Sequence, residues 1–492
     1  MNGFDNKKYL QLQTKKIKER VQEFGGKLYL EFGGKLFDDY HASRVLPGFK
    51  PDSKVAVLHA IKEQVEVVIV INAEDIAQNK LRGDLGITYH EDVLRLYDLL
   101  TSRGLLVSSV VIAQFSSDNA PAVKFQRKLE NLGLKVYRHY HIEGYPANIS
   151  KVVSDEGFGK NDYIETSRKV VVVTAPGPGS GKMATCLSQL YHDAKRGLKS
   201  GYAKYETFPI WNLPLTHPVN IAYESATADL DDLNMIDPYH MQAYGVSTVN
   251  YNRDVEVFPV LNALFTKLLG QSPYKSPTDM GVNMAGYCIS NDEVCCQASK
   301  QEVIRRYFSA KVQVRVGVSP QSMVEKLDLI MSKLGISESD RAVVNSARAY
   351  KKFAGKSVAA LQLKTGKIVT GKASCLMDCI AAVFLNSLKT LGRIPDIPLI
   401  EPSAIQPIQN LKTSMLGEVS SELNAEEALI ALSVSASINS LARRAFEQLP
   451  KLRGCQMHTT TIPSAVDEKI CHKLGIQLTS DDSYPTTRVY FK

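Results

Sequence analysis

The sequence predicts an α/β protein, with a doubly wound, mainly parallel sheet in the N-terminal part, a mostly helical middle and a mixed α/β C-terminal part. Apolar runs typical of buried strands alternate with helical patterns from residue 28 to residue 208. Strand patterns then largely stop, and helical patterns follow one another from 256 to 352. A hairpin pattern at 357–370 marks the return of strands. We therefore expect three domains, at residues 1–250, 251–354 and 355–492.

The alternation of strand and helix patterns in the N-terminal part predicts that the strands of the sheet run parallel. Helical patterns separate the successive apolar runs, and strands joined by helical crossovers are typically parallel. The expected strands lie at 28–32, 65–71, 106–113, 134–139, 168–174 and 202–208. Because ligands bind beyond the carboxyl ends of such strands, we expect the loops at those ends to form the site.

A glycine-rich turn, APGPGSGK at 175–182, gives the strongest functional clue. It follows 170–173, a continuous apolar run of the kind buried on both faces of a parallel sheet, and precedes a helix expected at 183–196. Glycine amides that open a helix can wrap an anion, so we predict a phosphate-binding loop. Its predicted ligand-binding residues are Gly177, Gly179, Ser180, Gly181 and Lys182, with Thr185 as the nearest spare hydroxyl.

The turn departs from the P-loop pattern GxxxxGK[ST]. The first glycine of that pattern falls on Pro176, and Met183 replaces the Ser or Thr that would hold Mg²⁺. Pro176 and Pro178 also remove two amide donors from the turn. The alternative is a tight strand-to-helix turn whose glycines serve its geometry only.

Two basic residues are predicted to be catalytic. Lys204 shares one face of the strand expected at 202–208 with Glu206, and Arg253 follows in the segment VNYNRDVEV. We expect Lys204 and Arg253 to neutralise phosphate charge. The alternative for Arg253 is a surface ion pair.

Carboxylates and a second glycine pair complete the predicted site. Clustered carboxylates suit Mg²⁺, which prefers oxygen ligands, although helix capping in a solvated turn is the alternative. The candidate metal ligands are Asp229, Asp231 and Asp232. Gly33 and Gly34, directly after the first expected strand, form a second candidate phosphate loop.

Composition excludes several classes of function. The formal charge of +8 is mild for 492 residues, and a single Trp with dispersed tyrosines offers no base-stacking platform, so we expect no nucleic-acid partner. No apolar stretch is long enough for a membrane helix, and the N-terminus has no apolar signal core. Eight cysteines without regular spacing are typical of reduced thiols, so we expect a cytoplasmic protein.

Zinc is not expected from the cysteine pattern. The C-terminal cysteines and histidines form no recognised zinc motif, and the adjacent Cys295 and Cys296 point in different directions on a helix. The hairpin at 357–370, followed by a helix with a cysteine, is similar to the opening of the cytidine deaminase fold. Because the zinc-binding pattern of those deaminases is missing, this likeness predicts a three-layer shape and no deaminase chemistry.

Long strings of the sequence resemble an uncharacterised bacterial protein family, known as a domain of unknown function. The strings include YLEFGGKL (29–36), VVTAPGPGSGK (172–182), GYAKYETFPIWNLPL (201–215), TADLDDLNMIDPYHM (227–241) and SPTDMGVNM (276–284). The resemblance covers essentially the whole chain. It implies a multidomain cytoplasmic protein with α/β ends, a helical middle and the same P-loop-like variant, and it implies no activity.

Three functions fit these patterns. The first is a nucleotide-dependent transferase or hydrolase that binds a small phosphorylated ligand; ATP with Mg²⁺ fits, as does a sugar phosphate or a dinucleotide. The second is a regulatory protein that binds such a ligand without turnover, which Met183 favours. A weaker third is an amino-acid-kinase-like enzyme that uses Gly33 and Gly34. The sequence is also compatible with a homo-oligomer.

Overall fold

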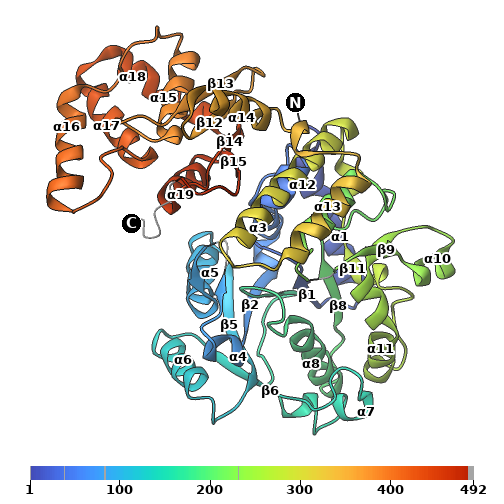
Figure 1. Ribbon diagram of the computed structural model, residues 1–492. Coiled ribbons are helices and arrows are strands. Elements are labelled where there is room, and N and C mark those ends of the chain that lie inside the picture. Colours follow the sequence, from blue (N-terminus) through green and yellow to red (C-terminus); the bar gives the residue numbers. More distant parts are fainter. Residues whose placement is uncertain (1, 38, 83–84, 231, 486–492) are drawn as a thin grey trace. The chain divides into compact units, whose positions relative to one another are not determined.

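The computed structural model describes residues 2–37, 39–82, 85–230 and 232–485 (Figure 1). The chain forms two compact units, Met1–Ser299 and Lys300–Lys492, and the boundary falls inside helix α12 (Asp292–Arg315). The domain boundaries predicted after residues 250 and 354 stay a prediction. The two units are described separately below.

The first unit contains a seven-stranded sheet in the order β11-β8-β1-β7-β2-β5-β6. Every pair of neighbouring strands runs parallel, which confirms the mainly parallel sheet expected from the sequence. The strands are β1 (Leu28–Phe32), β2 (Val65–Asn72), β5 (Leu106–Phe115), β6 (Val136–Tyr140), β7 (Val170–Thr174), β8 (Gly201–Tyr205) and β11 (Gly281–Val282). Strand β8 ends at Tyr205, three residues before the end expected from the sequence.

Helices cover both faces of this sheet (Figure 1). One face packs against α1 (Asn6–Glu23), α3 (Ser53–His59), α5 (Tyr89–Ser102) and α6 (Ala120–Asn131). The other face packs against α7 (Ile149–Val152), α8 (Lys182–Lys195) and α11 (Asn252–Leu269). The chain moves from β1 through β2 and β5 to β6, returns to β7, and continues to β8 and β11 on the other side. Because crossovers between parallel strands are right-handed, this reversal places the later helices on the opposite face.

Strand β7 lies at the centre of the unit, and its sequence explains why. Val170 and Val172 are buried in the core on one face, and Val171 and Val173 are buried in the core on the other. A strand that is apolar on both sides is stable only between two helical layers. The crossovers that follow β7 and its neighbour β2 leave toward opposite faces, which is the arrangement that opens a ligand crevice in such sheets.

Short elements complete the first unit. They are α2 (Tyr40–Val45), α4 (Ala73–Ala77), β3 (Leu81–Arg82), β4 (Ile87–Thr88), α9 (Pro218–Ala226), β9 (Asn234–Ile236), α10 (Pro238–Tyr244) and β10 (Val249–Tyr251). Strands β9 and β10 pair antiparallel as a small separate sheet. The segment from α9 to β10 therefore carries short helices and strands.

The second unit is built around a mixed four-stranded sheet in the order β13-β12-β14-β15. Strand β12 pairs antiparallel with both neighbours, whereas β14 and β15 are parallel. The strands are β12 (Val358–Gln362), β13 (Ile368–Lys372), β14 (Gln456–Thr459) and β15 (Gln477–Ser480). The predicted hairpin is β12–β13, and the mixed α/β character of this part is confirmed; β15 was not predicted.

Helices pack on both faces of the second sheet. Val343 and Ala347 of α14 contact Val358 and Ala360 on one face. The larger core lies on the other face, where α15, α17, α18 and α19 contribute apolar side chains. The helices of this unit, after the shared α12, are α13 (Gln321–Lys333), α14 (Ala342–Ala354), α15 (Cys379–Gly392), α16 (Pro402–Asn410), α17 (Ala425–Ile438), α18 (Ser440–Phe446) and α19 (Ala465–Leu474).

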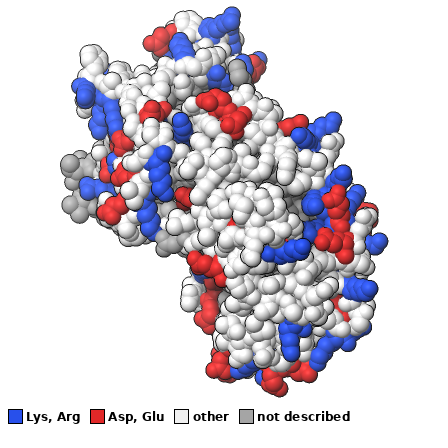
Figure 2. Space-filling view, turned by 90° about the vertical axis from the view of Figure 1, so that its right-hand side faces the viewer, with Lys and Arg blue, Asp and Glu red and all other residues white. Residues whose placement is uncertain are grey.

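The surface carries side chains of both charge signs, and helix α17 carries an exposed apolar stripe. On the face seen in Figure 2, basic and acidic side chains lie interspersed among large uncharged areas. Helix α17 exposes Ile430, Val434 and Ile438, which share one helix face at a spacing of four residues. Exposed apolar stripes of this kind often mark association surfaces, and self-association of the chain stays a prediction. In the described residues, no helix has the length and apolar character needed to cross a membrane.

The protonation of Asp378 tests whether this carboxyl group is buried in the second unit as the structure shows. Its carboxylate caps α15 by accepting the Ala381 N–H at 2.8 Å. Burial and the nearby Asp467 carboxylate raise the pKa of Asp378 well above its ordinary value. The folded state therefore keeps a proton that the unfolded chain loses, so this contribution is complete below the ordinary aspartate pKa of about 3.9 and declines as the pH rises.

We predict that Asp378→Asn raises the free energy of unfolding at pH 8 relative to the native chain, and has little effect at pH 4. Asparagine is an equally good helix cap and needs no proton. Denaturant unfolding at the two pH values measures this difference. Asp396→Asn is the control, because the Asp396 side chain is 95% exposed. An equal effect of Asp378→Asn at both pH values would contradict the assignment.

Candidate functional site

The turn at 175–181 joins β7 to α8, and its glycines are required by its shape. Gly179 and Gly181 adopt left-handed backbone angles, with φ of 75° and 96°. A Cβ on Gly177 would lie 2.1 Å from the Tyr89 hydroxyl, and one on Gly181 would lie 2.9 Å from the Ala113 Cβ. A Cβ on Gly179 would meet nothing within 4 Å. The turn is therefore packed against the protein at both ends and open in the middle.

The amide groups of this turn are left for an external acceptor. In the described parts of the chain, no hydrogen bond engages the N–H of Gly177, Gly179, Ser180 or Gly181. The N–H groups of 182–184 are the orphan donors of the first turn of α8. The buried Ser180 hydroxyl donates to the Gly177 carbonyl at 3.0 Å and holds the turn closed. This geometry favours an anion at the N-terminus of α8.

Lys182 is the first residue of α8 and is partly buried. No hydrogen bond or ion pair engages its ammonium group within the described residues. Burial lowers the pKa of Lys182; the Glu31 carboxylate opposes this effect, and the positive charges of Lys204 and Arg253 add to it. Lys182 therefore lies within electrostatic range of all three groups, and Glu31, the one anion among them, forms no direct ion pair with it in the described structure.

A largely buried acid–base cluster lies at the carboxyl ends of β1 and β8. The Lys204 ammonium is 3.0 Å from the Glu206 carboxylate and forms an ion pair with Asp254, at the start of α11. Glu31 on β1 is the register neighbour of Lys204 on β8, and it accepts a hydrogen bond of 2.7 Å from the Tyr202 hydroxyl. Both residues lie on the same face of the sheet as α8 and α11, because alternate side chains of a strand share a face. We call Glu31, Lys204, Glu206 and Asp254 the acid–base cluster.

The cluster holds more negative than positive charge. Burial acts to lower the pKa of Lys204, but Asp254, Glu206 and Glu31 hold it above its ordinary value. Burial, together with Asp254 and Glu31, raises the pKa of Glu206 to about 7 although Lys204 acts in the opposite direction. Three carboxylates thus surround one ammonium group, and one of them exchanges its proton near neutral pH. Such a group suits general acid–base chemistry.

Arg253 and Asp232, the predicted arginine and one of the predicted metal ligands, lie beside this cluster. Arg253 donates to the Asp232 carboxylate at 2.7 Å, and the Arg253 side chain is 62% exposed. Burial raises the pKa of Asp232, against the effect of Arg253. Asp229 lies exposed in the turn after α9, and Asp231 lies outside the described residues. Arg253 and Asp232 therefore neutralise each other at the edge of the site.

The second glycine pair is tied into the protein. The Gly33 N–H donates to the Tyr205 carbonyl at 3.0 Å, and the Gly33 carbonyl accepts from the Lys54 ammonium at 3.1 Å. Lys54 is buried and also pairs with Asp39 at 3.0 Å. The Gly33 and Gly34 loop thus joins β1 to β8 and to Lys54, next to the acid–base cluster.

Thr185 was predicted as a spare hydroxyl near the phosphate loop. It is fully buried on α8, and its Oγ1 has no hydrogen-bond partner in the described structure. Its position one turn into the helix makes it part of the α8 core contact rather than of the exposed turn.

Two members of the cluster were missed by the sequence reasoning. Glu31 was read as part of an apolar strand, and its place next to Lys204 depends on the pairing of β1 with β8. Asp254, next to Arg253, was predicted to belong to an anion clamp or to a surface ion pair, and its contact with Lys204 spans 50 residues. The polar alternation within YLEF was the one available signal for Glu31.

A hollow of about 540 Å³ lies away from these charges. Its lining includes Tyr239, Asn262, Tyr274 and Lys275, from α10, α11 and the segment that follows α11. None of the residues predicted to bind phosphate lines it. We place the candidate site at the unpaired amides and the acid–base cluster, because they supply the chemistry that the hollow lacks.

Comparison with known proteins agrees with the resemblance seen in the sequence. Two family models, described as the N-terminal and C-terminal domains of unknown function DUF1846, match residues 2–335 and 339–490. A UPF0371 protein of Corynebacterium urealyticum is 56% identical over 491 residues, which cover 100% of this chain and 99% of that protein. A UPF0371 protein of Streptococcus thermophilus is 53% identical with the same coverage. The similarity therefore spans both compact units.

We predict that Lys204→Met lowers the free energy of unfolding by about 3–5 kcal/mol, because it leaves the buried Glu206 and the partly buried Asp254 carboxylates without their counter-charge. Lys195→Met is the matched control: Lys195 pairs with Asp155, but its side chain is 51% exposed, so its loss should change stability little. Denaturant unfolding of the two variants measures both values. Equal losses would show that Lys204 does not neutralise a buried cluster.

Proposed function

This chain belongs to the family described as domain of unknown function DUF1846, and we propose that its N-terminal unit binds a nucleotide or phosphorylated metabolite at residues 177–182. The observation that carries the proposal is the convergence of unpaired amides with the unpaired Lys182 ammonium at the start of α8. A partly buried ammonium without a counter-ion is unfavourable, and a phosphate group would relieve this cost. The same group would accept the free amide donors of the turn.

The acid–base cluster gives this ligand a reactive neighbour. Charges of Glu31 and Lys204 act on Lys182, so a phosphate held by Lys182 would lie within electrostatic range of the cluster. Glu206, with a pKa of about 7, is suited to take up or release a proton at neutral pH. We propose phosphoryl transfer or hydrolysis as the reaction class, with Lys204 as the group that stabilises negative charge.

The excess of carboxylates favours a cation together with the phosphate. Mg²⁺ bridging ligand phosphates and carboxylates would offset the negative charge of Glu31, Glu206 and Asp254. ATP with Mg²⁺ is compatible with this arrangement, although Met183 removes the loop hydroxyl that holds the ion in a regular P-loop. Asp229 and Asp232 stay candidates for the same role.

A regulatory protein that binds the ligand without turnover is the second candidate. The replacement of that loop hydroxyl by Met183 favours it. Ligand binding without product formation in the presence of Mg²⁺ would select this function over the enzyme.

We predict that Lys182→Met abolishes stabilisation by the phosphorylated ligand while leaving the ligand-free protein folded. Thermal unfolding with ATP, ADP, nicotinamide dinucleotides, sugar phosphates and inorganic phosphate measures this, because a ligand at 100 times its Kd adds about 2.7 kcal/mol. Lys195→Met, at the other end of α8, is the control and should keep the full effect. Equal ligand stabilisation of both variants would place the ligand elsewhere.

We further predict that affinity for the phosphorylated ligand, measured without divalent cations, weakens as the pH rises through about 7. Ionisation of Glu206 adds a negative charge near the bound phosphate, since its pKa lies at about 7. Glu206→Gln removes this step and leaves only the pH dependence of the ligand itself. If calorimetric titrations gave the same pH dependence of ligand affinity for the native chain and for Glu206→Gln, this role of Glu206 would be refuted.

A further inference from the structure

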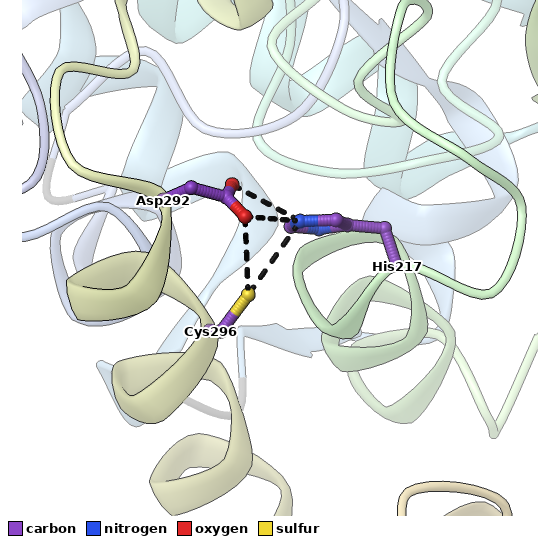
Figure 3. A group of neighbouring side chains, drawn as sticks. All are labelled: His217, Asp292 and Cys296. Atoms are coloured by element: carbon purple, nitrogen blue, oxygen red, sulfur yellow. Dashed lines mark hydrogen bonds and ion pairs between the residues drawn. The ribbon is translucent and has the colours of Figure 1, made fainter.

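Three side chains of different chemistry turn their ligand atoms toward one another in the first unit (Figure 3). The His217 Nε2 lies 3.1 and 3.3 Å from the two Asp292 carboxylate oxygens and 3.5 Å from the Cys296 sulfur. The Cys296 sulfur lies 3.7 Å from Asp292 Oδ2. Among the described residues, no other set of three His, Cys, Asp or Glu side chains brings its ligand atoms within 4.8 Å of one another.

Helix α12 and the start of α9 place these three side chains next to one another in the described structure. Asp292 and Cys296 are four residues apart on α12 and therefore share one helix face. His217 caps α9, where its Nδ1 accepts the Val219 N–H at 3.2 Å and Pro218 begins the helix. Cys295 turns the other way, and its sulfur approaches the Gly3 carbonyl at 3.4 Å. The adjacent cysteines thus diverge, as expected from the sequence, and only Cys296 faces His217.

The spacing of the three atoms matches a tetrahedral metal site. Zinc binds sulfur at about 2.3 Å, imidazole nitrogen at about 2.0–2.1 Å and carboxylate oxygen at about 2.0–2.2 Å. Tetrahedral angles then separate nitrogen and oxygen by about 3.4 Å, nitrogen and sulfur by about 3.5 Å, and sulfur and oxygen by about 3.6 Å. The observed separations through Asp292 Oδ2 are 3.3, 3.5 and 3.7 Å.

We propose that His217, Asp292 and Cys296 bind a zinc-type divalent ion through Nε2, a carboxylate oxygen and a thiolate. Thiolate and imidazole together select zinc-like ions over Mg²⁺ and Ca²⁺. Three protein ligands leave a fourth position for water or a substrate atom, which is the pattern of reactive rather than purely structural zinc sites. The Asp292 side chain is 59% exposed, so this position is reachable from solvent. The proposal does not rest on phosphate binding at α8.

Binding is coupled to protons in a defined way. Because His217 Nδ1 accepts the Val219 N–H, the metal-free neutral ring carries its proton on Nε2. The ion replaces that proton, which moves to Nδ1, and the Val219 hydrogen bond is lost. The Cys296 thiol releases its proton to solvent as the thiolate forms, so about one proton leaves for each ion bound. Affinity therefore falls as the pH is lowered.

A Cys–His nucleophile is a poorer interpretation of the same residues. In such sites the carboxylate orients the imidazole through one nitrogen, while the other nitrogen faces the nucleophile. Here Asp292 and Cys296 both approach Nε2, and Nδ1 faces the Val219 N–H rather than an orienting carboxylate. The arrangement converges on a point between the three groups, as metal ligands do.

The test uses the full chain, free of affinity tags, reduced and stripped of metal with a chelator. Titration with Co²⁺ is expected to give one ion per chain with a thiolate-to-cobalt charge-transfer band and the visible absorption of a tetrahedral ion. Zn²⁺ should then displace the cobalt and bleach the spectrum. Absence of any bound ion in the native chain would overturn the proposal.

Variants locate the ion. Cys296→Ser should lose the charge-transfer band, and His217→Asn, which keeps a good helix cap, should lose at least about 10- to 100-fold in affinity. Cys375→Ser is the control, because Cys375 is exposed and lies in the second unit. Unfolding curves of the metal-free variants show whether they are folded. A band that survives in Cys296→Ser, or disappears in Cys375→Ser, would place the ion elsewhere.

Discussion

The burial of β7 on both faces is the constraint on which the candidate site depends. Its valines alternate between two cores, so the strand can lie only in the middle of the sheet with helices above and below. The chain reaches this position by returning from the edge strand β6, and the right-handed crossover rule then sends α8 to the opposite face from α5 and α6. The glycine turn after β7 is thereby placed beside the crevice where ligands bind in doubly wound sheets. Packing of apolar side chains thus determines where the amide groups point.

The electrostatics of the site follow from the same arrangement. Side chains that point from β1 and β8 toward α8 and α11 lie in a layer that is otherwise apolar, and Glu31 and Lys204 are register neighbours in this layer. Desolvation shifts the pKa of Glu206 to about 7 and lowers that of Lys182, and the unequal number of acids and bases prevents complete neutralisation within the protein. A site whose charges are not balanced within the protein is suited to a charged ligand.

The sequence predicted the structural elements that depend on local pattern. It did not predict the contacts that depend on pairing between distant segments. The valine run at 170–173, the glycine turn and the helix after it were all placed correctly, because periodicity and turn chemistry are local properties. The parallel sheet followed from strand–helix alternation. The contact between Lys204 and Asp254 could not be predicted, since it depends on the packing of the α11 N-terminus against β8. His217 and Cys296 are 79 residues apart and form no motif, so the metal-binding geometry also required the fold.

The central claim is that the amides of the β7–α8 turn bind phosphate, and selective ¹⁵N-glycine labelling tests it most directly. Titration with ATP or inorganic phosphate should shift the amide resonances of Gly177, Gly179 and Gly181 in a saturable way, and Lys182→Met should remove the shifts. Gly270 lines the hollow beside α11 and should not respond. Saturable shifts at Gly270 with none at the three turn glycines would contradict the account.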